Sequence, residues 1–318
     1  MTVPWMRPLG STGLQVSALC LGGGPLGSMP ALFGRETPAE RGIATVLAAL
    51  DSPIRFIDTS NGYSDGDSER RIGEALRRAG GLPQGVVVET KTDPQGTDYS
   101  GDRVRRSVEE SMERLGFDQL PMVHLHDPEN FAFEELAATG GAVDALVALR
   151  EQGVVGAIGL AGGDVHEIAK YLALEVFDVL LVHNRWTLLD RSAGALIAEA
   201  HRQGMGVLNA AVYGGGILAH QDAAGSPTTY GYRPAPTPLL AAVAAMRAAC
   251  ARYGTDLPTA ALQFSVRDEG FASTIVGMSR PERVATTVAA AQASLPDDLF
   301  AELESLLPAE EFWLDAPL

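Results

Sequence analysis

The chain alternates eight times between a short apolar segment and a longer segment with helical periodicity, and this alternation restricts the fold more than any other feature. The short segments are rich in β-branched residues or Leu, which is typical of buried strands. The predicted strands are residues 18–23, 55–60, 85–91, 121–127, 155–161, 178–184, 206–212 and 273–278. We predict a helix after each of them.

Strands that are apolar along their whole length and separated by single helices indicate a parallel sheet buried on both faces. Eight such units in 318 residues predict an α/β fold, a closed (β/α)8 TIM barrel, as a single domain over residues 1–318. No Pro- or Ser-rich linker divides the chain. An open doubly wound sheet with a second domain is the alternative, because the number of strands does not prove that the sheet closes.

Helix boundaries are marked in two of the longer segments. After the third predicted strand, Ser100 or Asp102 can serve as the N-cap and Gly116 as the stop. After the second, Asp67 and Ser68 suit the start of a helix. Its apolar face has the spacing i, i+3, i+4 and i+7 and consists of Ile72, Ala75, Leu76 and Ala79.

Two segments lie outside the eight units. Residues 6–19 contain two short apolar arms around GSTG, which predicts a β-hairpin that caps the bottom of the barrel. Residues 214–238, after the seventh predicted strand, are too long and too rich in Gly, Pro, Ser and Thr for a simple connection. Long loops of this kind in compact domains are usually functional or disordered.

Composition restricts the partners. Twenty-four basic and forty acidic residues give a formal charge of −16, which argues against nucleic acid and anionic membranes as partners. Cys20 and Cys250 are isolated and indicate neither a disulfide framework nor a thiolate metal site. The start lacks the pattern of a signal peptide, and no segment has the roughly 18 apolar residues of a membrane span. We expect a cytoplasmic protein, either a monomer or a small homo-oligomer.

Four titratable residues fall at the ends of predicted strands or just after them, where (β/α)8 barrels place their reacting groups. Asp58 ends the second strand, Tyr63 follows in the next loop, Lys91 ends the third strand and His126 ends the fourth. Each has an ordinary structural explanation when it is taken alone: a turn cap, a loop aromatic, a surface lysine and a core histidine.

Together, however, the four residues suit proton transfer. Lys91 at the barrel mouth would be largely removed from water and would need an anionic partner, which Asp58 can supply. The ammonium would stabilise the phenolate of Tyr63 and lower the pKa of this phenol from its usual value of about 10. His126 can form a hydrogen bond with a substrate oxygen and hold it against the Tyr63 hydroxyl.

The same positions resemble a known family. DTSNGY, the Lys after strand three and the His before DP look like the Asp, Tyr, Lys, His tetrad of the aldo-keto reductase superfamily. The opening MRPLGSTGLQVSALCLGGGPLG, residues 68–76, 105–116 and 273–284 resemble that family in the expected order. HNRWTLLDR and NAAVYGGGIL look most like the branch with aldose 1-dehydrogenases, fucose and galactose dehydrogenases and pyridoxal 4-dehydrogenase.

The resemblance implies NAD(P)-dependent interconversion of a carbonyl and an alcohol on a small molecule. Hydride would pass between nicotinamide and the substrate carbon, while Tyr63 gives or takes the hydroxyl proton. Lys91 and Asp58 would assist Tyr63, and His126 would orient the oxygen. In the sugar-oxidising branch the substrate carbon would be C1 of an aldose and the product a lactone.

The cofactor would be NADP or NAD, bound across the barrel mouth. We expect no Rossmann-type dinucleotide site. Barrels commonly bind phosphate after strands seven and eight, where Gly214 to Gly216 would admit the pyrophosphate and Arg280 or Arg283 the adenosine phosphate or adenine. The residues implied for cofactor binding are Gly23, Gly24, Asp58, Gly162, His183, Asn209, Gly214, Gly216, Gly277, Ser279 and Arg283.

Several positions depart from the family pattern. Ala161 and Gly162 stand where many members have Ser-Asn for the carboxamide, and His183 replaces the usual Gln. Ala210 or its neighbour takes the place of the Tyr that commonly stacks on nicotinamide. Gly277 stands where many NADP-dependent members carry Lys, so the preference between NADP and NAD stays open.

Two other functions are weighed against this one. His124 and His126 form an HxH pair like that of metal-dependent barrel hydrolases, with His183 as a third ligand. That function would leave Tyr63 and Lys91 without a role, and we expect no metal. Some members of the superfamily are non-catalytic binding or regulatory subunits, but the intact tetrad argues against this function.

The candidate substrate residues are Trp186 after strand six and, in the long loop, Tyr230, Tyr232 and Arg233. Their mixed polarity favours a polyol or a pyridine alcohol. We expect oxidation of an aldose such as L-fucose, D-arabinose or an L-galactose-like sugar. The alternatives are an NADPH-dependent aldehyde or ketone reductase and a pyridoxal 4-dehydrogenase.

Overall fold

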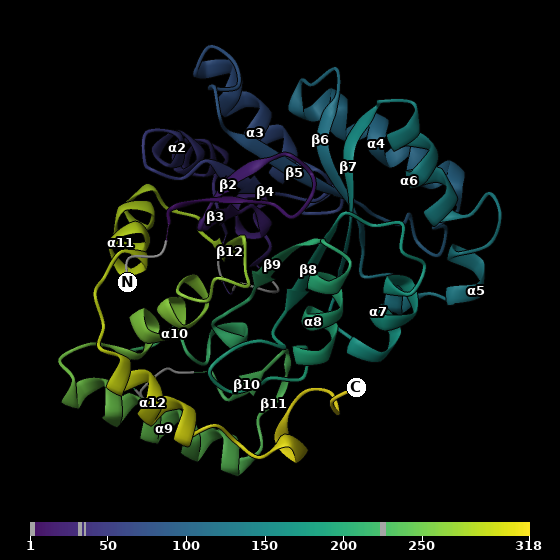
Figure 1. Cartoon of the computed structure of the whole chain (residues 1–318). Coiled ribbons are helices and arrows are strands. Elements are labelled where there is room, and N and C mark those ends of the chain that lie inside the picture. The colour runs from purple at the N-terminus through teal and green to yellow at the C-terminus, as the bar shows by residue number, and fades with distance from the viewer. Residues whose placement is uncertain (1–3, 31–33, 35, 223–226) are drawn as a thin grey trace.

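The computed structural model describes residues 4–30, 34, 36–222 and 227–318, and its centre is a closed barrel of eight parallel strands (Figure 1). Each strand overlaps one of the eight predicted ranges, and closure excludes the open doubly wound sheet. The prediction of a (β/α)8 barrel is therefore confirmed. In spatial order the strands are β12 (Ser273–Gly277), β3 (Leu19–Gly22), β4 (Phe56–Asp58), β5 (Val87–Thr92), β6 (Leu120–His126), β7 (Val155–Gly162), β8 (Val179–His183) and β9 (Gly206–Ala210).

Helices surround the barrel and bury the outward faces of the strands (Figure 1). They are α2 (Ala39–Leu50), α3 (Asp67–Arg78), α4 (Gly101–Leu115), α6 (Ala142–Glu151), α7 (Val165–Leu172), α8 (Gly194–Arg202), α10 (Leu257–Val266) and α11 (Pro281–Ala291), with the short α5 (Phe133–Leu136) before α6. Helices α9 (Thr237–Arg252) and α12 (Asp297–Ser305) pack together beside α10 over a separate apolar cluster (Figure 1).

The predicted ends of α4 are both found. The Ser100 hydroxyl accepts a hydrogen bond from the Arg103 amide at 3.3 Å, which satisfies one of the free N–H groups of the first turn. Gly116 ends the helix with φ 76°, a left-handed conformation that glycine adopts without a steric penalty. Helix α3 begins at Asp67, as its sequence predicts.

Side chains alternate between the barrel interior and the helices along each strand. In β5, Val88 packs in the outer core, whereas Val87 belongs to the interior cluster, and the same period of two places Glu89 and Lys91 inside. The lower interior is filled by Phe56, Met122 and further apolar residues. Glu89 and Lys91 therefore bring polar groups into the upper part of the interior.

The N-terminal hairpin closes the bottom of the barrel. Strands β1 (Met6–Pro8) and β2 (Gln15–Ser17) pair antiparallel, and Leu9 and Val16 complete the interior cluster. The Ser11 amide donates to the Gly204 carbonyl at 3.1 Å, just before β9 begins. Substrate access from this end is blocked, so the open end is the one at the carboxyl ends of the strands.

The long loop after β9 has some regular structure. It begins with η3 (Gly214–Gly216) and contains β10 (Thr229–Tyr230) paired with β11 (Arg233–Pro234). The Arg233 guanidinium donates to the Leu314 carbonyl at 3.2 Å, so the C-terminal segment supports this small hairpin. Within the described residues, no helix is both long enough and apolar enough to cross a membrane.

Candidate active site

A cavity of about 480 Å³ opens at the carboxyl ends of the barrel strands. Each of the eight strands, or the loop directly after it, contributes to its wall. The lining residues are Gly22, Gly24, Pro25, Met29, Asp58, Gly62, Tyr63, Lys91, Asp93, His126, Asp127, Ala161, Leu181, His183, Ala210, Ala211, Tyr232, Ile275 and Gly277. The four residues that the sequence singles out, Asp58, Tyr63, Lys91 and His126, are all among them.

Lys91 and Asp58 form a buried ion pair at the floor of this cavity. The Lys91 ammonium also donates to the Thr59 carbonyl at 2.7 Å and to the Tyr63 hydroxyl at 3.4 Å. Burial lowers the pKa of Lys91, but Asp58, Tyr63 and Glu89 together outweigh burial, and the net pKa is raised above its usual value. Lys91 therefore stays charged, as a lysine with a close anionic partner should.

Tyr63 differs from the sequence expectation in its pKa. Burial raises this pKa, and although Lys91 lowers it, three carboxylates, Asp58, Asp93 and Asp127, raise it further. The ammonium therefore lowers the pKa of Tyr63 as expected, but the net pKa is raised above its usual value. The reason is that burial, together with these carboxylates, outweighs the effect of the lysine charge. Tyr63 is a firmly protonated phenol, suited to donating a proton.

His126 is bound to a carboxylate that sequence reasoning missed. Its Nδ1 lies 2.7 Å from Oδ1 of Asp93 and 3.2 Å from the hydroxyl of Ser60. The ring stands edge-on to Tyr63, with 5.8 Å between centroids and 77° between planes. Burial lowers the pKa of His126, but Asp93 and Asp127 outweigh it and the pKa is raised. The ring of His126 is thus held in place by the contacts of its Nδ1 atom with Asp93 and Ser60.

A sequence signal for Asp93 does exist. Glu89, Lys91 and Asp93 occupy alternate positions, so they point to the same side of β5 and its continuation. Because every second residue of this strand points into the barrel, the residue two positions after Lys91 is expected to do so as well. This residue is Asp93, which adds a second carboxylate beside Asp58 at the mouth of the barrel.

A second pair of titratable residues lies one step below the cavity floor. Nε2 of His124 is 2.9 Å from Oε2 of Glu89, and both side chains are fully buried. Burial raises the pKa of Glu89 to about 8, and burial together with the Lys91 charge lowers the pKa of His124 to about 3. His124 therefore does not reach the cavity, and it does not share a site with His126 as the HxH reading requires.

The residues implied for cofactor binding fall into two groups, those that line the cavity and those that lie on the helix-facing side of the strands. Gly24, His183 and Gly277 line the cavity together with Asp58. Gly23, Gly162 and Asn209 do not, because each lies one residue away from a cavity residue and faces the helices.

The outward positions have their own structural explanations. Gly23 lies against Ser68, and Gly162 against Ile168 and Glu129, so closely that no Cβ would fit. The Asn209 amide donates to the Trp186 carbonyl at 2.9 Å and to the Ser265 hydroxyl at 2.8 Å. Gly22, Ala161 and Ala210 line the cavity beside these positions, and the cofactor contacts of Gly23, Gly162 and Asn209 stay predictions.

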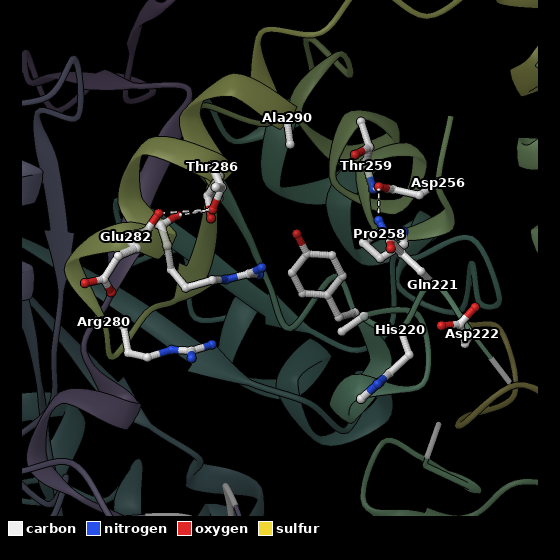
Figure 2. A pocket seen from close by; sticks show the side chains of 14 residues that line it. His220, Gln221, Asp222, Asp256, Pro258, Thr259, Arg280, Glu282, Thr286 and Ala290 are labelled. Carbon is white, nitrogen blue, oxygen red and sulfur yellow. Dashed lines mark hydrogen bonds between the residues drawn. The ribbon is translucent and has the colours of Figure 1, made fainter. Parts of the chain in front are cut away.

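A second cavity, of about 770 Å³, lies between the starts of α10 and α11 and the loop after η3 (Figure 2). Its lining includes Arg280 and Glu282 at the start of α11, Asp256 and Thr259 at the start of α10, and His220, Gln221 and Asp222 from the loop (Figure 2). Gln221 donates to Asp256 at 2.8 Å. Arg283 and Tyr213 complete the wall, so both predicted arginines lie in one cavity.

The glycines after β9 and Ser279 lie outside both walls. Gly214 has φ 60° and packs on the ring of Tyr230, and Gly216 has φ 109°, so both are required by the turn itself. Ser279 is buried, and its hydroxyl has no hydrogen-bond partner among the described residues. Their contacts with phosphate stay predictions.

Of the candidate substrate residues, only Tyr232 lies at the cavity. Trp186 is not part of the cavity wall, and its indole N–H donates to Asp268 at 3.2 Å. Tyr230 is buried and donates to the Asn184 carbonyl at 2.5 Å, so the substrate contacts of Trp186 and Tyr230 stay predictions. Arg233 lies outside the wall, bound to Leu314.

Three groups with metal-ligating atoms approach one another at the rim. Asp127, Glu129 and His183 each have one such atom within 4.8 Å of the others. Glu129 also accepts hydrogen bonds from the Gly163 amide at 2.5 Å and the Asp164 amide at 3.2 Å, so this carboxylate has a structural role. The set differs from the one expected for a hydrolase, which consists of His124, His126 and His183.

Comparisons with known proteins agree with this geometry. The sequence model of the Aldo/keto reductase family matches residues 18–308. Pyridoxal 4-dehydrogenase of Microbacterium luteolum is 31% identical, over 94% of this chain and 96% of its own. L-galactose dehydrogenase of Arabidopsis thaliana is 32% identical, over 96% and 95%, and D-threo-aldose 1-dehydrogenase of a Pseudomonas species is 30% identical, over 92% and 94%.

Solved structures show the same fold. The holo form of an aldo-keto reductase from Bacillus halodurans superposes with a TM-score of 0.78 over 96% of each chain, at 22% identity. The similarity therefore extends over the whole barrel and its surrounding helices.

Proposed function

This chain belongs to the aldo/keto reductase family and is an NAD(P)-dependent oxidoreductase that acts on CH–OH and C=O groups, and from this premise we propose that it oxidises an aldose at C1 to a lactone. The observation that carries the proposal is the contact of Lys91, itself paired with Asp58, with the hydroxyl of Tyr63 inside a cavity that also contains His126. Two relatives of about 30% identity are named as dehydrogenases of sugars.

The structure offers groups that fit the dinucleotide. In the described part of the chain, Arg280 and Arg283 form no ion pair, and both enter a cavity large enough for a nucleotide. The buried hydroxyl of Ser279, which lies between Gly277 of the first cavity and Arg280 of the second, lacks a partner. When bound, the nicotinamide ring supplies the hydride chemistry.

The chain's own residues handle the proton and the oxygen. In carbonyl reduction, Tyr63 donates its phenolic hydrogen to the substrate oxygen, and the Lys91 ammonium stabilises the phenolate that forms. In alcohol oxidation the same proton returns to Tyr63. His126 contributes a second hydrogen bond to that oxygen, so the oxygen is held between two side chains.

The character of the wall favours a hydroxylated substrate. Asp93, Asp127, His183 and Tyr232 offer polar atoms around a floor of Ala161, Leu181 and Ala210. Such a mixture can bind sugar hydroxyls on one side and the apolar face of a ring on the other.

The test is an absorbance assay of NAD⁺ and NADP⁺ reduction with L-fucose, D-arabinose, L-galactose and pyridoxal. Aldehyde and ketone reduction is measured in parallel with both reduced cofactors. Oxidation of a sugar supports the proposal. Oxidation of pyridoxal alone favours the second candidate, which the relative from Microbacterium luteolum suggests. Rapid aldehyde reduction without sugar or pyridoxal oxidation rejects both.

A further inference from the structure

Asp93 and His126 form a carboxylate–imidazole pair at the wall of the active-site cavity, at the ends of neighbouring strands β5 and β6. We infer that Asp93 is a positioning residue: it holds His126 in the Nδ1–H tautomer, so that Nε2 donates a hydrogen bond to a carbonyl only when the ring is protonated and accepts one from an alcohol when the ring is neutral. The part of this inference that concerns substrates rests on the proposed function.

The first group next to Nδ1 of His126 is the carboxylate of Asp93. Its Oδ2 accepts hydrogen bonds from the Gly62 amide, at 2.6 Å, and from the Ser60 hydroxyl. Burial raises the pKa of Asp93, but His126 and these hydrogen bonds outweigh burial and lower it. Asp93 is therefore an ionised acceptor and cannot donate to the imidazole.

Ser60 leads to the same conclusion. Its single hydroxyl hydrogen is directed to Asp93, so it can offer only a lone pair to Nδ1 of His126, 3.2 Å away. Both groups next to Nδ1 are therefore acceptors. A neutral imidazole carries one hydrogen, and here this hydrogen must be on Nδ1.

The position of Asp93 is fixed by its own surroundings. Its backbone amide donates to the Ser107 hydroxyl at 3.2 Å, and its carbonyl accepts from Arg103 at 2.9 Å. Gly62 allows the close approach, because a Cβ at this position would lie 2.8 Å from the Asp93 carboxyl carbon. The carboxylate is thus built into the wall rather than carried on a free loop.

The other nitrogen of the ring is on the cavity side. Asp127 places Oδ2 3.8 Å from Nε2, and His183 lies 3.7 Å from the other oxygen of Asp127. Tyr63 presents its ring to His126, and Lys91 and His124 are further titratable groups that act on it. The hydroxyl of Tyr99 accepts a hydrogen bond from the backbone amide of His126 at 2.9 Å. A substrate oxygen held by Tyr63 would meet Nε2 without another donor between them.

The consequence is a hydrogen bond that depends on pH. Asp93 and Asp127 together raise the pKa of His126 against the effect of burial, so the protonated ring persists to higher pH than an ordinary histidine. Below this pKa the imidazolium can orient a carbonyl. Above it, the lone pair of Nε2 repels a carbonyl oxygen and can accept the hydrogen of an alcohol.

Nitrogen-15 NMR of histidine-labelled protein tests the tautomer directly and needs no turnover. His126→Gln assigns the resonance among the six histidines. At a pH where the ring is neutral, we expect the hydrogen on Nδ1 in the wild type. A hydrogen on Nε2 overturns the inference, whatever the assays of function show.

Two variants separate charge from geometry. Asp93→Asn keeps an oxygen acceptor but removes the charge, so the titration midpoint of His126 should move at least about 1 pH unit toward acid. Asp102→Asn, an exposed carboxylate on α4, is the matched control and should leave it unchanged. Ser60→Ala should keep the Nδ1–H tautomer. An equal midpoint in Asp93→Asn and the control overturns the inference.

The pH dependence of KM provides a further measurement, which would not change if Asp93 had a purely structural role. The pH at which KM for a carbonyl substrate begins to rise should shift toward acid in Asp93→Asn, by the same amount as the NMR midpoint. A uniform loss of kcat at all pH values overturns the substrate part of the inference. Failure of every substrate would reject the proposed function but leave the NMR result valid.

Discussion

The ammonium of Lys91 lies 3.4 Å from the phenolic oxygen of Tyr63 and uses its last hydrogen on that contact. Its other two hydrogens go to Asp58 and to the carbonyl of Thr59. Because the Tyr63 oxygen accepts from Lys91, its own hydrogen is free to point toward the cavity. In the proposed reaction, this hydrogen is the one that Tyr63 exchanges with the substrate oxygen.

Replacement of Tyr63 by Phe removes that hydrogen and little else. We expect kcat to fall by about 10²- to 10⁴-fold, the usual contribution of general acid–base catalysis, with unchanged affinity for the dinucleotide. Steady-state kinetics and a fluorescence titration with cofactor measure the two effects. Tyr253→Phe, a partly exposed tyrosine at the end of α9, is the control. Turnover above about 1% of wild type would exclude Tyr63 as the proton donor.

The ion pair of Lys91 and Asp58 should contribute to stability as well as to chemistry. Asp58→Asn leaves a fully buried ammonium without its carboxylate, and we expect the free energy of unfolding to fall by about 3–5 kcal/mol. Urea denaturation measures this value, with the exposed Asp102→Asn as the control. The double variant Asp58→Asn with Lys91→Met should be less destabilised than Asp58→Asn alone. If it is equally destabilised, the loss does not come from the unpaired charge.

The buried pair of Glu89 and His124 should shape the dependence of stability on pH. The pKa of Glu89 is raised from 4.5 to about 8, so between these values the folded protein binds more protons than the unfolded chain and loses stability as pH rises. The pKa of His124 is lowered from 6.5 to about 3, so between these values the folded protein binds fewer protons and gains stability as pH rises.

The two effects oppose each other between about pH 4.5 and 6.5, and above pH 6.5 only the loss from Glu89 remains. Glu89→Gln should therefore abolish most of the decline in the free energy of unfolding between pH 6.5 and 8. Denaturation curves across this range measure the slope, and the exposed Glu109→Gln should retain the wild-type decline. A variant that declines as steeply as wild type would show that Glu89 does not titrate there.

The barrel was predictable because each strand is buried on both faces and its residues alternate in direction with a fixed period. That period also decides which residues at the end of a strand line the cavity. Asn209 and Gly162 were assigned to the cofactor, yet Ala210 and Ala161 line the cavity. An error of one residue in the predicted position of a strand end moves a side chain from the barrel interior to the helix-facing side. The sequence alone does not locate a strand end to within one residue.

Other residues depended on contacts that are distant in sequence. Trp186 lies outside the barrel because Asp268, far along the chain, accepts its indole hydrogen. Tyr230 is buried because its hydroxyl reaches the Asn184 carbonyl. The raised pKa of Tyr63 results from burial and from carboxylates on three different strands or the loops after them. The pattern of residues within one segment cannot predict contacts and electrostatic effects that combine residues from distant segments.

The cavity of Figure 2 leads to a prediction about the cofactor. Arg280 and Arg283 enter it with no ion pair among the described residues, in a chain of formal charge −16, so an anionic group of the dinucleotide should bind there. Arg280→Ala combined with Arg283→Ala should weaken binding of NADP⁺ by about tenfold or more, since each charge-assisted hydrogen bond contributes roughly 1.5–3 kcal/mol.

Fluorescence titrations with NADP⁺ and NAD⁺ distinguish which phosphate is bound. A larger loss for NADP⁺ than for NAD⁺ places the arginines on the ribose phosphate that only NADP⁺ carries, whereas equal losses place them on the shared pyrophosphate or on adenine. Arg105→Ala, an exposed residue on α4, is the control for the loss of positive charge. Unchanged affinity for both cofactors would show that the nucleotide does not enter this cavity, and the mouth of the barrel would then have to bind it without these cations.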